Sequence, residues 1–336
     1  MSPRDDDVLV RLAALLAAGS ATPTLQALIG ADTDRLPRPG AGRTLARWRA
    51  LAAVAARDLA LVKLYEGHTD ALAILAELDG PPPPAASRWG TWCAEPPDAR
   101  VELRPDPDGR GVRLHGTKAW CSGAAMSTHA LLSAWNDRGE PCLVAVALDQ
   151  PGITVTSDGW HAVGMADTGS VDVRFDGALA TPVGRPGAYV ARPGFWQGGA
   201  GIAACWYGGA QAIAEMTRRR LGSKPDAHRL AHLGAMDVAL AGAAATLRET
   251  AAWIDAHPRA DAQRPASRAR LTVEDAATRV LDHAGRALGA GPLCRDARFA
   301  RAMADLPVFL RQSHAERDLA SLGAGLVIDE DSPWTL

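Results

Sequence analysis

The spacing of hydrophobic residues changes twice along this sequence, and that order limits the folds that the chain can adopt. Apolar residues recur at helical spacing in the N-terminal region, alternate with polar residues in the middle region, and return to helical spacing in the C-terminal region. Short alternating runs are typical of strands with one buried face. The sequence therefore predicts an α+β protein with an N-terminal helical domain over 1–85, a central antiparallel β-sandwich or barrel over 86–190, and a C-terminal four-helix bundle over 191–336.

Glycine and proline mark the ends of the helical stripes. In the N-terminal region a short stripe ends at Gly19, a longer stripe runs from Leu45 to Val62, and a third ends at Gly80. Four consecutive prolines follow Gly80, and they cannot continue a helix. Pro307 is expected to bend or restart the last helix of the bundle. The four helices expected there cover 195–221, 230–254, 272–289 and 300–323.

The middle region contains short strand-like runs and one run that is apolar throughout. Asp-Gly and Pro-Gly pairs separate alternating runs that include Val101–Leu103, Val112–Leu114 and Ile153–Val155. The run Leu143–Leu148 has no polar alternation, which predicts a strand that is buried on both faces.

Charge and cysteine usage argue against several classes of partner. The formal net charge is −2 with acids and bases interspersed, so we expect neither nucleic acid nor a membrane surface as a partner. The five cysteines are widely spaced and include no CxxC pair, which argues against a disulfide framework and a zinc site. The opening MSPRDDD lacks the apolar segment of a secretory signal. We therefore expect a reduced, cytoplasmic protein without a metal site.

The segment GTKAWCSG, from Gly116 to Gly123, resembles a strand segment of the acyl-CoA dehydrogenase family of flavoproteins. In that family the tryptophan packs against the flavin isoalloxazine ring, and a hydroxyl two residues later hydrogen-bonds the polar edge of the ring. The resemblance implies FAD as the cofactor, with Trp120, Cys121 and Ser122 in contact with it. A flavin needs a flat apolar neighbour and a polar group near its edge, and these residue types supply both.

Two further segments extend the resemblance. The segment from Gly152 to Phe175 matches the family pattern in register, including Met165, Thr168 and Ser170. RRRLG places Arg218 where the family has an arginine that reaches the FAD pyrophosphate of a neighbouring subunit. ALGAGP places Gly289 and Gly291 where the family has a turn that contacts the ADP half of the cofactor. The resemblance therefore implies a homodimer or homotetramer.

The sequence departs from the family at two places that concern chemistry. The loop that supplies further flavin contacts reads WCAEPPDARVEL, with Ala94 in place of a hydroxyl residue and Glu95 retained. The glutamate that removes the substrate α-proton falls at Gln312 or Ser313 in one family position and at Gly198 in the other. No carboxylate stands there, so Glu316, about one helical turn away, is the candidate base.

Three functions fit this pattern. The first is an FAD-dependent oxidoreductase that desaturates an acyl thioester carried by CoA or by a carrier protein. The second is a flavin-dependent monooxygenase of the same fold, which does without the glutamate; RQSHAERD, residues 311–318, loosely resembles the C-terminal segment of that branch. The third is a catalytically silent member that serves as a structural or binding subunit.

Overall fold

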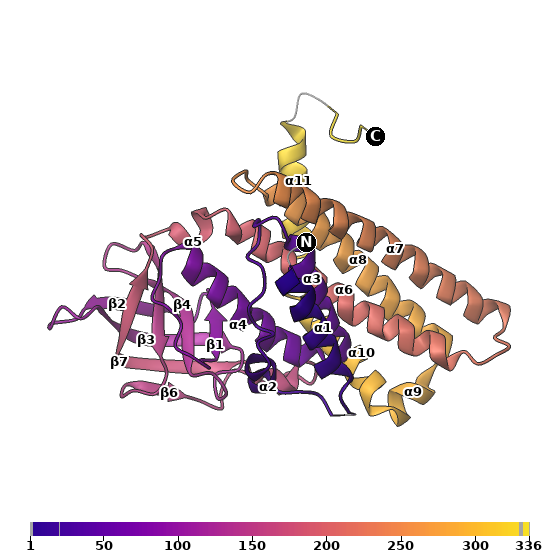
Figure 1. The fold of residues 1–336 in the computed structure, drawn as a ribbon, viewed down its shortest axis with the longest axis horizontal. Coiled ribbons are helices and arrows are strands. Elements are labelled where there is room, and N and C mark those ends of the chain that lie inside the picture. The colour runs from indigo at the N-terminus through magenta and orange to yellow at the C-terminus, as the bar shows by residue number, and fades with distance from the viewer. Residues whose placement is uncertain (1–2, 20, 329–331, 336) are drawn as a thin grey trace. The chain divides into compact units, whose positions relative to one another are not determined.

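The computed structural model describes residues 3–19, 21–328 and 332–335 and has a mixed α+β fold, as the sequence predicts (Figure 1). Met1 and Ser2 of the N-terminal stretch lie outside the described residues. Packing divides the chain into two compact units, Met1–Pro39 with Ala60–Phe195, and Gly40–Leu59 with Trp196–Leu336. The units follow packing rather than chain order, because the segment 40–59 packs with the C-terminal helices.

The helices of the first unit come from both sides of the strand region. They are α1 (Pro3–Ala17), α2 (Leu25–Gly30), α4 (Leu59–Glu77) and α5 (Ala188–Ala191). The Thr24 hydroxyl caps α2 by accepting a hydrogen bond from the amide of Ala27 at 3.2 Å. The long stripe expected from Leu45 to Val62 is two helices rather than one. Asp58 is extended (φ −163°, ψ 128°), so the chain leaves α3 before α4 begins.

Seven strands form the sheet of the first unit. They are β1 (Trp89–Trp92), β2 (Val101–Pro105), β3 (Val112–Cys121), β4 (His129–Trp135), β5 (Pro141–Ala147), β6 (Ile153–Val155) and β7 (Val171–Val183). The pairings run from β4 through β2, β3, β7 and β5 back to β4, which closes a small barrel, while β1 and β6 pair outside this ring. The expectation of a purely antiparallel sheet is wrong at two places. β4 pairs in parallel with both β1 and β2, because the chain makes the β2–β3 hairpin before it returns to this edge.

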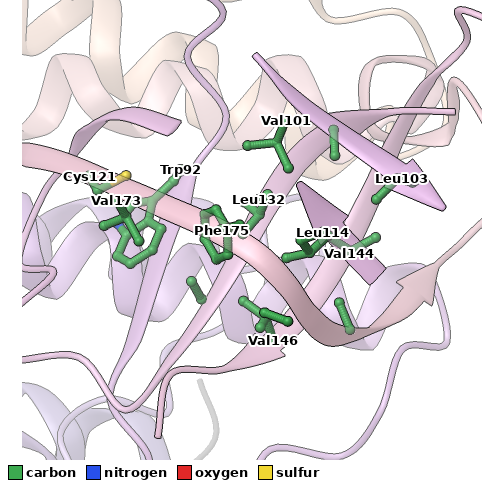
Figure 2. Packing of buried hydrophobic residues seen from close by; sticks show 14 of the residues in the cluster. Trp92, Val101, Leu103, Leu114, Cys121, Leu132, Val144, Val146, Val173 and Phe175 are labelled. Atoms are coloured by element: carbon green, nitrogen blue, oxygen red, sulfur yellow. The ribbon is translucent and has the colours of Figure 1, made fainter. Parts of the chain in front are cut away.

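Apolar side chains from the barrel strands form the core shown in Figure 2, with Phe175, Leu114 and Trp92 among its largest members. The strand β5 contributes to two cores. Val144 and Val146 face this barrel core, while Leu143 and Ala145 pack on the other face against a cluster that contains Ile74 and Leu75 of α4. This confirms the prediction of a strand buried on both faces.

The second unit is helical. It contains α3 (Thr44–Arg57), α6 (Gly194–Arg220), α7 (Ala227–Ala256), α8 (Gln263–Leu288), α9 (Ala290–Arg295), α10 (Ala297–Leu310) and α11 (Glu316–Val327). The last expected segment is two helices, α10 and α11. Pro307 does not interrupt α10, which continues to Leu310; the break falls at 311–315, where Ala315 adopts a positive φ of 47°.

Helix α7 is the longest helix and carries apolar residues on more than its buried face. Met236, Ala243 and Leu247 are buried, whereas Leu230 and Val238 are 51% and 66% exposed. Within the described ranges α7 alone has the length and composition of a membrane span, and 28% of its most apolar window is buried. One such helix is weak evidence for a membrane, since the test rests on length and composition alone.

Candidate functional site

The indole of Trp120 stands at the end of β3 and is half exposed. Between the pairs Lys118–Val173 and Cys121–Val171, β3 has one more residue than β7, which is a β-bulge. Trp120 adopts a left-handed backbone conformation there, with φ +56°, and its side chain is 51% exposed. This conformation costs a non-glycine residue on the order of 1–2 kcal/mol. The fold thus keeps a large aromatic side chain out of the barrel core at a cost in backbone strain.

An ion pair between the buried Lys118 and the partly exposed Glu95 lies next to this bulge. The Lys118 ammonium, 0% exposed, donates to Glu95 Oε1 at 2.5 Å and to the backbone oxygen of Ser133 at 3.0 Å. Trp135 Nε1 donates to the other carboxylate oxygen of Glu95 at 2.9 Å. Partial burial opposes ionisation of Glu95, but the hydrogen bonds from Lys118, Ser133 and Trp135 outweigh it and hold the pKa of Glu95 below its usual value. The carboxylate of Glu95 therefore holds β3 through Lys118. Ala94, the residue before it, is half-buried.

The Cys121 side chain points away from the surface that displays Trp120. It belongs to the barrel core (Figure 2), and its thiol donates to the backbone oxygen of Lys118 at 3.1 Å. Burial raises the pKa of this thiol far above its usual value. Any contact of Cys121 with a ligand beside Trp120 is therefore limited to its backbone.

Ser122 joins the two sequence segments that carried the family resemblance. Its hydroxyl lies 2.8 Å from the Ser170 hydroxyl, which lies 2.8 Å from that of Thr168. The amide of Gly123 donates to the backbone oxygen of Thr168 at 2.7 Å, and Gly123 adopts a φ of +70°. The two segments are thus joined by a side-chain hydrogen bond across 48 positions of the chain and by a backbone hydrogen bond next to it.

A small depression with a cavity volume of about 10 Å³ lies beside Ser122 within the first unit. Helix α4, strand β1 and the turn after β3 provide most of its walls, which combine apolar side chains with hydroxyls and one lysine. Its lining includes Lys63, Leu64, Thr91, Ser122, Met126 and Ser127. Lys63 is paired with Glu66, its ammonium 3.5 Å from the carboxylate.

In the second unit, Arg218 forms a two-point contact with Glu215 one turn earlier in α6. Its Nε and Nη2 atoms donate to the two Glu215 oxygens at 2.7 and 2.8 Å. The hydrogen bonds from Arg218 and Arg219 lower the pKa of Glu215 to about 2. Gly289 and Gly291 lie in and just after the exposed α8–α9 turn, and Gly289 has a positive φ of 64°. The roles that the resemblance implies for Arg218 and both glycines stay predictions.

The two family positions of the catalytic glutamate carry no acid in the structure. Ser313 is 5% exposed and Gln312 is exposed, both in the turn before α11, while Gly198 lies in the first turns of α6. Glu316 is the first residue of α11 and is exposed, so its environment gives no sign of a carboxyl group set up as a base. Among the residues that the structure describes, no group of three or more potential ligands could hold a metal ion.

Comparison with solved structures shows that the chain has an acyl-CoA dehydrogenase-like fold. KijD3 in complex with FMN and dTDP-3-amino-2,3,6-trideoxy-4-keto-3-methyl-D-glucose has a TM-score of 0.79 and 22% identity, covering 98% of this chain and 96% of that one. FMN-bound TdsC from Paenibacillus sp. A11-2, a dibenzothiophene monooxygenase, has a TM-score of 0.81 and 21% identity, covering 98% of both chains.

The sequence comparisons cover less of the chain. No family model matches the sequence. Amino sugar nitrososynthase DnmZ from Streptomyces peucetius is 39% identical over 84 residues, which cover 22% of this chain and 20% of that protein. The match thus spans about a fifth of this curated relative.

Proposed function

We propose that this protein is a monooxygenase that uses reduced FMN. The observation that carries the proposal is the half-exposed indole of Trp120, two residues before Ser122 in the chain, in a fold that solved FMN-bound enzymes share along nearly their whole length. The absence of a carboxylate at both family positions supports the same conclusion, because transfer of oxygen to a substrate needs no base for an α-proton.

The residues around Trp120 fit a flavin. The indole offers an apolar face to an isoalloxazine ring, and the Ser122 hydroxyl offers a hydrogen-bonding group to its polar edge. A bound reduced flavin supplies the electrons that activate molecular oxygen. The ion pair of Lys118 and Glu95 keeps the bulge in place and so positions the indole. FMN lacks the ADP half of FAD. Under this proposal Arg218, Gly289 and Gly291 therefore do not make the contacts with that half that the family resemblance implies.

For the substrate we propose an amine on a nucleotide-linked amino sugar, oxidised at nitrogen. The support is the similarity to the amino sugar nitrososynthase and to KijD3, whose complex contains a dTDP-linked amino sugar. Desaturation of an acyl thioester, with Glu316 as base, is the competing function. The comparisons favour the monooxygenase, because TdsC is named a dibenzothiophene monooxygenase and DnmZ an amino sugar nitrososynthase, and neither name refers to an acyl thioester.

Two assays separate these functions. In the first, reduced FMN is supplied by a flavin reductase with catalase present, and substrate-dependent oxygen uptake is measured with a panel of dTDP-amino sugars. We expect uptake above that of free reduced FMN and a product heavier by oxygen. In the second, the protein with oxidised flavin is mixed with acyl-CoAs without oxygen. Bleaching of the flavin by an acyl-CoA would contradict the proposal, as would a protein that binds no flavin.

We also propose that the protein is a homo-oligomer that uses the exposed face of α7. Gly234, Val238, Ala241 and Ala245 are spaced by four, three and four residues, which places them on one face. Ala241, Ala245 and Gly234 are exposed and small, and such residues let a second helix approach closely. A second copy of the chain would cover Val238 and Leu230, the large apolar residues that α7 leaves in water.

A further inference from the structure

Three hydroxyl groups form a chain that ends at Ser122. Ser122 and Ser170 are 2.8 Å apart, Ser170 and Thr168 are 2.8 Å apart, and the Thr168 hydroxyl donates to the backbone oxygen of Met165 at 2.8 Å. Thr168 is 1% exposed and Ser170 is 4% exposed, so bulk water does not compete within the inner portion of the chain.

The carbonyl at the inner end fixes the direction of this chain. A carbonyl oxygen only accepts, and each hydroxyl has a single proton to donate. The Met165 oxygen also accepts from the Thr168 amide at 3.0 Å and from Trp160 Nε1 at 3.2 Å, and the contact with the Thr168 hydroxyl is the shortest of the three. With the Thr168 proton used there, Ser170 must donate to Thr168, and Ser122 must donate to Ser170.

The backbone around the chain keeps its members in place. Gly123 donates to the Thr168 oxygen, and Trp92 Nε1 donates to the backbone oxygen of Ser122 at 3.1 Å. Met165 and Gly169, which flank the short 3-10 helix Ala166–Thr168, both have left-handed backbone conformations. The hydroxyls therefore sit on a tightly turned segment with little freedom to rearrange.

We infer that Thr168 and Ser170 are positioning residues that make the Ser122 hydroxyl a hydrogen-bond acceptor, so that the site selects the reduced form of the flavin. The inference rests on the proposed function. With its proton directed at Ser170, Ser122 presents only lone pairs to a ligand. The flavin N5 atom carries a hydrogen in the reduced form and only a lone pair in the oxidised form. N5–H of reduced FMN can donate a hydrogen bond to the Ser122 hydroxyl oxygen. In oxidised FMN the lone pair of N5 would face a lone pair of that oxygen, and neither atom could donate.

The test compares the affinities of the whole protein for FMN in its two redox states. Binding of oxidised FMN is measured in air, and binding of reduced FMN is measured anaerobically with dithionite, both from protein fluorescence. We expect the wild type to bind reduced FMN more tightly. In Ser170→Ala the Ser122 proton is freed and can be donated to N5 of oxidised FMN. The ratio of the dissociation constant for oxidised FMN to that for reduced FMN should therefore fall by about fivefold, the effect of one hydrogen bond of ~1 kcal/mol.

Three further variants keep the test decisive. Thr168→Val removes the donor at the inner end and should lower the ratio in the same direction, whereas Thr168→Ser retains the donor and should preserve it. Thr156→Val removes a hydroxyl that donates to the Asp172 oxygen at 2.7 Å, outside the chain, and should leave the ratio unchanged.

The outcomes distinguish the inference from the function on which it rests. A wild-type ratio that persists in both Ser170→Ala and Thr168→Val, with folded protein by circular dichroism, would overturn the role of the hydroxyl chain while leaving flavin binding intact. Equal affinity of the wild type for both redox states would overturn it as well. Failure of the wild type to bind FMN in either state would overturn the proposed function itself.

Discussion

A tryptophan with a left-handed backbone and an exposed indole raises the free energy of the folded state in two ways, through backbone strain and through apolar surface in water. Trp120 combines both features, while its neighbours Ala119 and Cys121 are buried. A residue that only stabilised the barrel would not need either. Both features support the proposal that a ligand, the proposed flavin, covers the indole.

The first prediction follows from this strain. Trp120→Gly places at φ +56° the residue that tolerates it best, so the free energy of unfolding should change by less than about 1 kcal/mol. The affinity for reduced FMN should fall by roughly tenfold or more, because the apolar face is lost. Urea denaturation and anaerobic FMN titration measure the two effects. Trp334→Ala, which removes a tryptophan that is 77% exposed elsewhere, is the control and should change neither.

The second prediction concerns the ion pair below the bulge. Glu95→Gln leaves the Lys118 ammonium buried without its carboxylate, and at pH 7 the variant should lose about 1–3 kcal/mol of unfolding free energy. The folded-state pKa of Glu95 is depressed, so this stability is present above the usual pKa near 4.5 and is lost as the pH falls through the lower folded value. Urea denaturation at pH 7 and between pH 5 and 3 should show the difference shrinking with acidification. A difference that is constant over this range would contradict the assignment.

At the residue scale, the site was only partly predictable from the sequence. Trp120 and Ser122 stand out because an aromatic and a hydroxyl share one short motif. The side-chain direction of Cys121 was not predictable, since the bulge changes which residues of β3 face the core. The hydroxyl chain could not be read from sequence either, because its direction depends on a contact with the Met165 carbonyl.

Elements with clear hydrophobic periodicity were predictable, and those without it were not. Helices α6 and α7 and strands β2 and β7 carry regular patterns and lie where these patterns indicate. Strand β4 was missed because four of its five central residues are fully buried and no polar alternation marks it, and β1 because it has only four residues. The break between α3 and α4 at Asp58 was not predictable. The spacing of apolar residues indicates which residues are buried, but not that one polar residue within the stripe has an extended backbone.

The third prediction tests the packing of α3 against α6. A Cβ atom added at Gly208 of α6 would overlap the backbone oxygen of Ala52 in α3. Gly208→Ala should therefore lower the free energy of unfolding by about 1–3 kcal/mol, since backbone cannot yield as a side chain can. Gly285→Ala, on α8 with nothing within 4 Å of the added atom, is the matched control and should be neutral or stabilising. Thermal unfolding compares the pair, and equal shifts would contradict the close approach.

At the scale of the whole molecule, the fourth prediction concerns assembly through α7. Val238→Glu places a charge on the exposed apolar face and should convert the proposed oligomer to a monomer, as measured by light scattering after gel filtration. Val327→Glu changes an equally apolar residue that is 85% exposed on α11 and should leave the mass unchanged. A wild-type mass of one chain, or an unchanged mass in Val238→Glu, would contradict assembly through this face.

The most direct test of the central claim is a single turnover in labelled oxygen. Protein loaded anaerobically with reduced FMN and a dTDP-amino sugar is mixed with ¹⁸O₂, and the product is analysed by mass spectrometry. A monooxygenase transfers one atom of O₂ to its substrate and releases the other as water with the two electrons of the reduced flavin, so the proposed function predicts one ¹⁸O atom in the product of the single oxidation that one reduced FMN supports. A sugar recovered without label across the substrate panel, from a protein whose oxidised flavin is bleached by an acyl-CoA, would contradict it.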